Sequence, residues 1–189
     1  KAVEGLKFWM SEYCILGDNN GEIEGNGRDL GIDPALYMAK VIHSDLAIAN
    51  ASAWHWWMAI SPYDYKDGLI YIDKNKKDGN FYESKMLWVL GNYSRFIEPD
   101  SKRIKASVSK DSSLLASAYI NKAKSKVTLV IINSEEKAIK IKQSLNNNDI
   151  VNFKSYTTSK DQDLAYTLNS ESHIVIPERS IVTVVSDLK

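Results

Sequence analysis

The chain has 189 residues, and 24 lysine plus arginine balance 24 aspartate plus glutamate, so the formal net charge is zero. This length can hold one large domain or two small ones, and the balanced charge argues against nucleic acid or an anionic membrane surface as a partner. No apolar run approaches the ~20 residues that span a bilayer, and the first residues lack the pattern of a signal peptide.

The first half of the chain alternates strands with helices. Residues 8–15 are apolar, with aromatic and β-branched members, which predicts a strand. Asp33-Pro34 offers an N-cap followed by proline at the first helical position, and apolar residues then recur at helical spacing to about residue 50. Residues 51–60 are apolar on both faces, as expected of a strand in a parallel sheet.

A long polar loop and a second helix complete this half. The loop covers residues 61–80, and apolar side chains at helical spacing predict a helix over 81–96. Strand–helix–strand–helix makes two βα units of a parallel architecture. Two units cannot close a barrel, and an open parallel pair would expose its edges.

The second half changes character near Glu98-Pro99, which predicts one domain over 1–97 and another over 98–189. Regularly spaced β-rich runs with polar turns between them predict a β-sandwich. The predicted strands cover residues 105–108, 114–120, 126–133, 138–142, 152–158 and 180–186. Aromatic residues are sparse here, so no carbohydrate platform is evident.

Glu12 is the leading candidate for chemistry. It ends the first apolar run and precedes a loop rich in Gly, Asp and Asn. Barrel enzymes place catalytic groups at the carboxyl ends of their strands, and a carboxylate there can serve as a nucleophile. The alternative is a rim carboxylate that caps a helix or pairs with Arg28. Tyr13, beside Glu12, is a candidate for contacting substrate.

The run Trp54-His55-Trp56-Trp57 supplies flat aromatic faces of the kind that cover a sugar ring. Alternation places Trp54 and Trp56 on one face of the strand and Trp57 on the other, so all three cannot serve one site. Trp57 is the best candidate, and core packing is the alternative for all three tryptophans. Tyr63, in the following loop, could line a subsite or belong to an ordinary surface turn.

Other patterns give weak signals. The three histidines, His43, His55 and His173, lack metal-ligand spacing, so no metal site is expected. Cys14, the one cysteine, excludes an intrachain disulfide and is interpreted as a small buried hydrophobe. The Gly-x-Gly at residues 25–27 lacks the third glycine of a nucleotide-binding turn.

Several separated blocks resemble glycoside hydrolase family 30, most closely the bacterial endo-β-1,6-galactanase-like members. The blocks are residues 9–13, 37–57, 61–69, 84–88, 93–99 and 177–183. The resemblance implies the carboxyl-terminal part of a (β/α)8 barrel, strands seven and eight, followed by a β-sandwich side domain. It also implies retaining chemistry without a cofactor, with Glu12 as nucleophile and Trp57 stacked on the sugar, and Trp54 and Trp56 as further candidates for that contact.

Two departures from the family constrain the predicted function. The acid/base of the family ends the fourth barrel strand, which lies in an amino-terminal barrel segment outside these residues, so the chain alone is expected to be inactive. The glucuronoxylan-specific members carry an arginine where Ser61 stands here, which favours β-1,6-galactan or β-1,6-glucan as substrate. The family further implies a secreted or periplasmic location. A non-catalytic carbohydrate-binding or scaffold module is the alternative.

Overall fold

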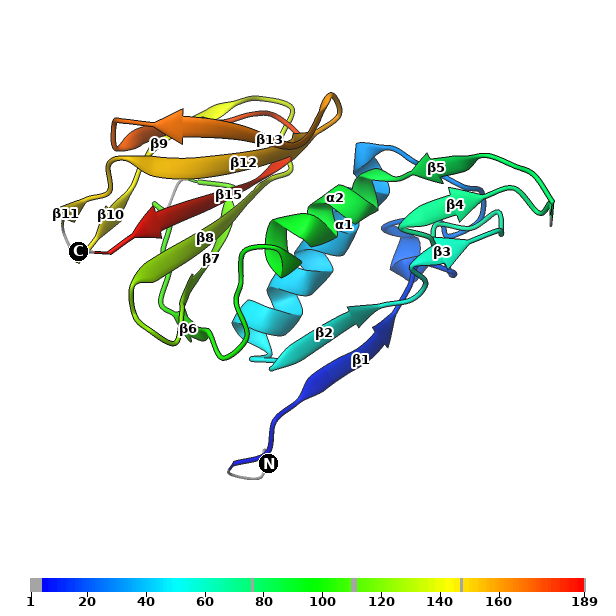
Figure 1. Cartoon of the computed structure of the whole chain (residues 1–189), viewed down its shortest axis with the longest axis horizontal. Coiled ribbons are helices and arrows are strands. Elements are labelled where there is room, and N and C mark those ends of the chain that lie inside the picture. Colours follow the sequence, from blue (N-terminus) through cyan, green and yellow to red (C-terminus); the bar gives the residue numbers. More distant parts are fainter. Residues whose placement is uncertain (1–4, 76, 110–111, 147, 189) are drawn as a thin grey trace. The chain divides into compact units, whose positions relative to one another are not determined.

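The computed structural model describes residues 5–75, 77–109, 112–146 and 148–188, and it divides into two compact units, Lys1–Leu87 and Trp88–Lys189. The first unit contains a parallel pair of strands joined through a helical crossover, as the sequence predicts (Figure 1). The crossover consists of α1 (Ile32–His43), which continues into the π-helical turn η2 (Ser44–Ile48). The pair consists of β1 (Trp9–Tyr13) and β2 (Ala53–Trp56).

The cap of α1 differs from the prediction. Gly31 is the N-cap, without a side-chain hydrogen bond, and Asp33 lies in the first turn. A carboxylate in the first turn still complements the positive end of the helix dipole. One face of α1 is buried, including Leu36, Met38 and Ile42.

The predicted loop over 61–80 contains strands, so this part of the prediction is wrong. A small sheet has the order β3-β4-β5. A short helical turn lies between β1 and α1 in the chain. These elements are η1 (Asn19–Gly21), β3 (Ile60–Ser61), β4 (Ile70–Ile72) and β5 (Phe81–Glu83). The predicted helix over 81–96 correspondingly begins later, as α2 (Lys85–Ser94).

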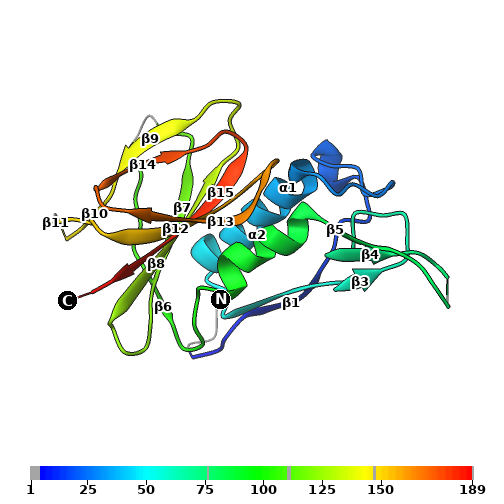
Figure 2. The ribbon, with the colours of Figure 1, turned by 45° about the horizontal axis from the view of Figure 1, so that its top comes forward.

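The second unit is a β-sandwich. Its large sheet has six strands in the order β13-β12-β15-β8-β7-β6, all antiparallel. The bounds are β6 (Lys102–Ile104), β7 (Leu115–Ile120), β8 (Lys126–Asn133), β12 (Phe153–Ser159), β13 (Gln162–Asn169) and β15 (Ser180–Asp187). Opposite it lie β9 (Ile139–Lys142), β14 (His173–Ile176) and the short pair β10 (Ser144–Leu145) and β11 (Asn148–Asp149), as Figure 2 shows.

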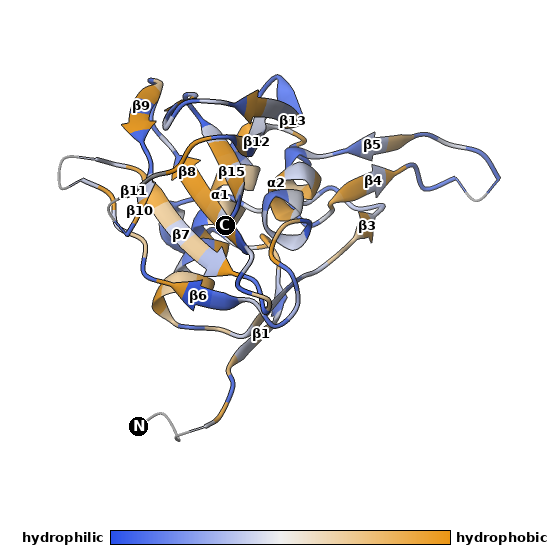
Figure 3. Ribbon diagram, turned by 60° about the vertical axis from the view of Figure 1, so that its left-hand side comes forward, coloured by the Kyte–Doolittle hydropathy of each residue, from blue (hydrophilic) through white to orange (hydrophobic). Residues whose placement is uncertain are grey.

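The core of the sandwich lies between β8, β12 and β15 on one side and β14 on the other. Phe153, Ile176, Val182 and Val184 are almost wholly buried there. Strongly hydrophobic residues lie along β7, β8 and β15 (Figure 3). The strand predicted over 105–108 is absent from the described residues, and β6 instead ends at Ile104. The domain boundary predicted after residue 97 stays a prediction.

Candidate active site

A bulge in β1 sets the direction of Glu12. Met10 pairs with Trp54 and Tyr13 pairs with Trp56, so β1 uses three steps where β2 uses two. The extra residue bends the strand and redirects the side chains beside it. Glu12 precedes Tyr13 and therefore projects from the opposite face, where it is exposed to solvent.

Trp57 extends the pairing beyond β2. Its backbone N–H donates to the Tyr13 carbonyl oxygen at 2.9 Å. Because it follows Trp56, its side chain lies on the same face as Glu12, and the residue is 48% exposed. The sequence predicts Glu12 and Trp57 at neighbouring strand ends, and in the structure both residues are exposed there.

Two further aromatic residues occupy this face, and the sequence reasoning passed over them. Trp9 is 59% exposed, and its ring centroid lies 6.1 Å from that of His55. The His55 ring also hydrogen-bonds through Nδ1 with the Met10 carbonyl oxygen, at 3.3 Å. Strand alternation relative to Trp57 could have found His55, whereas Trp9 lies on β1 and comes to this face through the pairing of the two strands. We name Trp9, Glu12, His55 and Trp57 the Glu12 face.

The opposite face of the same strands carries a compact aromatic cluster. The ring centroids of Tyr13, Trp54 and Trp56 lie 6.0–6.2 Å from one another. Tyr13 and Tyr37 of α1 share a hydroxyl hydrogen bond of 3.1 Å, which shows that this face is turned toward the helix. Burial and that hydrogen bond raise the pKa of Tyr13 well above its usual range.

The indole N–H groups of this cluster are satisfied within the first unit. Trp54 donates from Nε1 to Oδ2 of Asp45 at 2.8 Å, and Trp56 donates from Nε1 to the Asp67 carbonyl oxygen at 2.8 Å. This packing favours a structural role for both tryptophans and for Tyr13. Their contact with substrate, expected from the sequence, stays a prediction.

The loops that follow β1 and β2 are fastened to each other at the carboxyl ends of the strands. Isolated bridges join Ile15 to Lys66 and Asn26 to Tyr65. The Lys66 ammonium donates to the Asn26 and Gly27 carbonyl oxygens at 2.8 and 3.0 Å. The loop after Glu12 is therefore held in place by the loop after Trp57, which gives the site a defined rim.

Tyr63 stands on this rim. It is 48% exposed, and the Lys74 ammonium lies 5.1 Å from its ring centroid. Its backbone N–H donates to Ser61 Oγ at 3.1 Å, and Ser61 itself is fully buried. Ser61, which stands where the glucuronoxylan-specific family members carry an arginine, is thus a small neutral residue inside the protein.

Arg28 does not pair with Glu12. Its guanidinium lies over the Tyr71 ring at 4.6 Å and near the Tyr82 ring at 5.9 Å, an arrangement typical of cation–π contacts. Its backbone N–H donates to Asp64 Oδ1 at 2.7 Å. No ion pair joins Glu12 to a basic residue in the part of the chain that the structure describes, so the carboxylate is exposed without a cationic partner there.

Cys14, which the sequence predicts to be a small buried hydrophobe, is only partly buried in the structure, so that prediction is wrong in its burial. Burial, followed by the negative charges of Glu12 and Asp67, raises its pKa above the ordinary value. A raised pKa keeps the thiol protonated at neutral pH and therefore a poor nucleophile. No group of three or more metal-ligating side chains occurs among the described residues. No described helix is both long and apolar enough to cross a membrane.

Two family models match consecutive parts of the chain. Residues 1–71 match O-glycosyl hydrolase family 30, and residues 100–184 match the glycosyl hydrolase family 30 beta sandwich domain. The curated relative glucuronoxylanase XynC from Bacillus subtilis is 26% identical over 186 residues. That alignment covers 96% of this chain and 40% of the relative.

Solved structures share the fold along nearly the whole chain. A conserved exported protein from Bacteroides fragilis is 33% identical, with a TM-score of 0.81, over 96% of this chain and 39% of the other. The family 30 subfamily 8 xylanase Xyn30A from Clostridium acetobutylicum is 25% identical, with a TM-score of 0.72, over 97% of this chain and 43% of the other. The chain thus spans about 40% of the length of the relatives it matches.

The architecture predicted from the sequence is confirmed by these comparisons. The fold is the carboxyl-terminal part of a (β/α)8 barrel followed by a β-sandwich side domain. Both family 30 models match, in order, the two parts of the chain that have the corresponding folds. The chain belongs to glycoside hydrolase family 30.

Proposed function

We propose that this chain carries the nucleophile of a retaining glycoside hydrolase that cleaves a β-linked polysaccharide. The observation that carries the proposal is the Glu12 face. An exposed carboxylate at the carboxyl end of β1 shares this face with Trp57, at the end of the neighbouring parallel strand. Barrel enzymes build their active sites at this end of their strands.

In the proposed reaction, Glu12 attacks the anomeric carbon and forms a glycosyl-enzyme. A second carboxyl group, initially protonated, donates its proton to the leaving oxygen and then, as a carboxylate, takes a proton from the water that releases the sugar. Retention requires the two carboxyl groups to lie ~5–5.5 Å apart. We assign the second carboxylate to an amino-terminal barrel segment outside residues 1–189, and the 189 residues alone are then inactive. The reaction uses no cofactor.

The proposed substrate is β-1,6-galactan or β-1,6-glucan. Buried, uncharged Ser61 supports a neutral sugar, because it cannot hold the carboxylate of a glucuronic acid. The names of the relatives favour a second candidate, since the curated one is a glucuronoxylanase and a solved one is a xylanase. The exported relative from Bacteroides fragilis supports the expected secreted or periplasmic location.

Glu12→Gln tests the nucleophile in the complete gene product. The exchange keeps the size of the side chain but removes the attacking carboxylate, so hydrolysis should fall by at least about a thousandfold. Glu22→Gln is the matched control, because Glu22 is also exposed and lies in the loop after β1. Reducing-sugar release from β-1,6-linked glucan and galactan measures both variants.

A fluorinated, slowly released substrate gives a second readout. The glycosyl-enzyme should appear in mass spectra of the unaltered protein, attached to the peptide that contains Glu12, and not in those of Glu12→Gln. Near-normal hydrolysis by Glu12→Gln would end the assignment. Binding of glycan by the complete protein without any hydrolysis would support the alternative, a carbohydrate-binding or scaffold module.

A further inference from the structure

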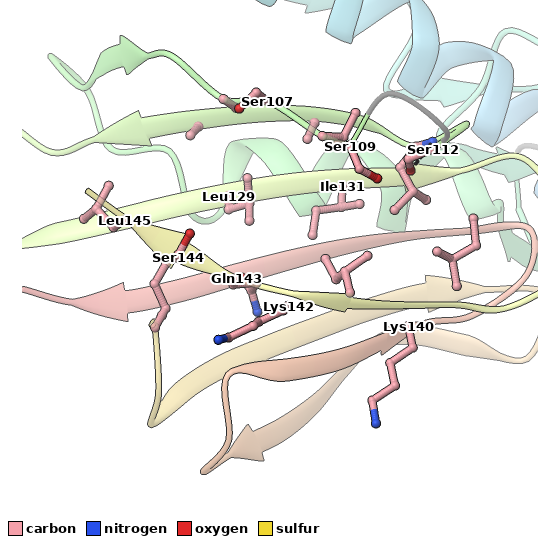
Figure 4. Close-up of a pocket in the computed structure, with 18 of the residues that line it drawn as sticks. Ser107, Ser109, Ser112, Leu129, Ile131, Lys140, Lys142, Gln143, Ser144 and Leu145 are labelled. Carbon is pink, nitrogen blue, oxygen red and sulfur yellow. Dashed lines mark hydrogen bonds between the residues drawn. The ribbon is translucent and has the colours of Figure 1, made fainter. Parts of the chain in front are cut away.

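The groove of the second unit offers no acid–base chemistry. It has a volume of about 1080 Å³ and is lined by β7, β8 and β9. Figure 4 shows serines, aliphatic residues, Gln143 and the lysines of β9 along it. Its described lining contains no acidic, aromatic, histidine or cysteine side chain. The carboxylates and the thiol that bear on the proposed reaction therefore lie in the first unit.

Asp67, in the loop between β3 and β4, carries a buried carboxylate. The residue is 5% exposed, and its Oδ1 atom has no hydrogen-bond partner among the described residues. Its backbone carbonyl oxygen accepts hydrogen bonds from Nε1 of Trp56 at 2.8 Å and from the backbone N–H of Met58 at 2.7 Å, which fix the residue beside the end of β2. A buried charge without a partner costs free energy, and such groups gather at functional sites.

The pairing of the two loops places Asp67 opposite Cys14. The isolated bridge between Ile15 and Lys66 is antiparallel. Cys14, one residue earlier, therefore lies opposite Asp67, one residue later. Glu12 and Cys14 are two residues apart and share one face of the extended chain. Glu12 is then diagonal to Asp67, and such diagonal neighbours lie ~7–8 Å apart.

The charges of both carboxylates reach the thiol of Cys14. After burial, which has the largest effect, Glu12 and Asp67 each raise the pKa of this thiol. Two like charges that act on one group between them also act on each other, and each opposes ionisation of the other. Salt screens this repulsion only weakly, because Asp67 is buried.

The neighbouring cationic and titratable groups have other contacts. Burial raises the pKa of Tyr71, the charge of Asp67 adds to this effect, and the charge of Arg28, which lies 4.6 Å over the Tyr71 ring, opposes it. The Lys66 ammonium donates to backbone carbonyl oxygens, and the His55 ring bonds with another. No ion pair joins either carboxylate to a basic residue in the described ranges. The repulsion between the two carboxylates is therefore not cancelled by a paired cation there.

We propose that Asp67 is a positioning residue of the active site, whose buried charge opposes ionisation of Glu12 and so sets the lower limit of the pH range in which Glu12 attacks. The inference rests on the proposed function of Glu12. Asp67 acts through Glu12 and does not touch the substrate, because it is buried. An amino-terminal barrel segment that encloses the site would strengthen the repulsion by displacing water.

The pH dependence of kcat/KM in the complete gene product tests the inference. The acid limb of this profile reports protonation of the attacking carboxylate. Asp67→Asn removes the charge at nearly constant size, so the midpoint of the acid limb should move to lower pH by roughly 0.5–1 pH unit. Asp64→Asn is the matched control, because Asp64 lies in the same loop but is exposed. Its charge is screened by water, so the midpoint should stay unchanged.

Cys14 gives a readout that does not require hydrolysis. Its rate of alkylation by iodoacetamide reports the thiolate fraction, and mass spectrometry of the peptide that contains Cys14 follows it in the complete product. Asp67→Asn and Glu12→Gln should each raise this rate about threefold at about pH 8, because each removes a negative charge beside the thiol. Asp64→Asn should leave the rate unchanged.

An unchanged acid limb in folded Asp67→Asn would overturn the inference, because a merely structural carboxylate can change stability without moving the pH profile. An unchanged alkylation rate would also overturn it, since Asp67 would then carry no charge beside Cys14. If Asp67→Asn does not fold, Asp67→Ser removes the same charge with a smaller side chain, and the same two results are expected. A complete product that hydrolyses no glycan would overturn the proposed function and this inference with it, whereas the alkylation rate would still show whether Asp67 is charged.

Discussion

Trp54 and Trp57 differ in environment although they lie close together in the chain. Trp54 packs against Tyr13 and Trp56 and donates a hydrogen bond to Asp45, whereas Trp57 is 48% exposed. Trp57→Ala should lower kcat/KM of the complete product roughly tenfold, the effect of losing one aromatic stacking contact of ~1.4 kcal/mol. Its free energy of unfolding should change little, because the side chain is exposed.

Trp54→Ala should behave in the opposite way. Loss of its ring from the cluster should lower the free energy of unfolding by about 3 kcal/mol. Activity per folded molecule should be retained, since the ring lies on the face away from Glu12. Denaturant unfolding and kinetics on the same samples separate the two variants. Normal stability of Trp54→Ala with lost activity would show that Trp54 belongs to the substrate site.

His43 should make the stability of the chain depend on pH. It is buried on α1, its Nδ1 has no hydrogen-bond partner among the described residues, and burial lowers its pKa. In the unfolded chain the same group binds a proton near its ordinary pKa of ~6.5. The stabilising effect of a neutral His43 is therefore complete above that pH, and it is lost as the pH falls toward the lower pKa of the folded state.

Thermal unfolding measured between about pH 7.5 and about pH 5 checks this behaviour. Replacing His43 with leucine should flatten the decline of the melting temperature across that range. His55→Leu is the control, because His55 is exposed, and it should leave the decline unchanged. An unaltered decline in His43→Leu would assign the pH dependence to other groups.

At the scale of elements, the rim of the site depends on close backbone contact at Gly25. A Cβ at this position would lie 2.4 Å from the Leu16 carbonyl carbon. The contact is with backbone, which cannot move aside as a flexible side chain can. Gly25→Ala should therefore separate the loop from the strand end and lower the free energy of unfolding by about 2 kcal/mol.

Gly17→Ala provides the comparison, because a Cβ there meets nothing within 4 Å. It should be neutral or slightly stabilising, since alanine reduces the freedom of the unfolded chain. Denaturant unfolding measures both variants, and activity of the complete product should fall with Gly25→Ala. Equal stability of the two variants would show that the loop relaxes around the new methyl group.

The sequence predicts elements best where burial is strong. β8 (Lys126–Asn133) has the predicted bounds, because almost every residue in it is buried and apolar or β-branched. β13 (Gln162–Asn169) is missed, since it is an edge strand with many exposed polar residues. β3, β4 and β5 are missed because each has three residues or fewer and depends on pairing across loops rather than on a local pattern.

The candidate site is predicted in part for a related reason. Strand position singles out Glu12, and alternation separates Trp57 from Trp54 and Trp56. The bulge between Met10 and Tyr13 could not be predicted, since it arises from the pairing of two strands distant in sequence. Which face meets the helix also depends on tertiary contacts such as Tyr13 with Tyr37. The place of Trp9 on the Glu12 face depends on the same strand pairing and could not be predicted from the sequence, whereas His55 follows from alternation along β2.

For the whole molecule, the substrate question is whether the site binds a neutral β-1,6-linked glycan or a xylan that carries glucuronic acid. One relative is named a glucuronoxylanase and another a xylanase. Glucuronic acid carries a carboxylate, whose specific recognition requires a cation or several donors. At position 61 this chain has a buried serine that accepts a hydrogen bond from Tyr63, so it offers no charge there.

The complete gene product should therefore hydrolyse β-1,6-galactan or β-1,6-glucan at least roughly tenfold faster than glucuronoxylan, because one lost substrate contact already has an effect of that size. Initial rates on the three polysaccharides, with residues 1–189 alone as an inactive control, measure this preference. Faster hydrolysis of glucuronoxylan would require a different cation for the uronic acid. Arg28, held over Tyr71 on the loop after β1, would then be the first residue to replace. If Arg28→Gln reduced activity on glucuronoxylan but not on unsubstituted xylan, Arg28 would be the cation that binds the glucuronic acid, a role that the uncharged Ser61 cannot have.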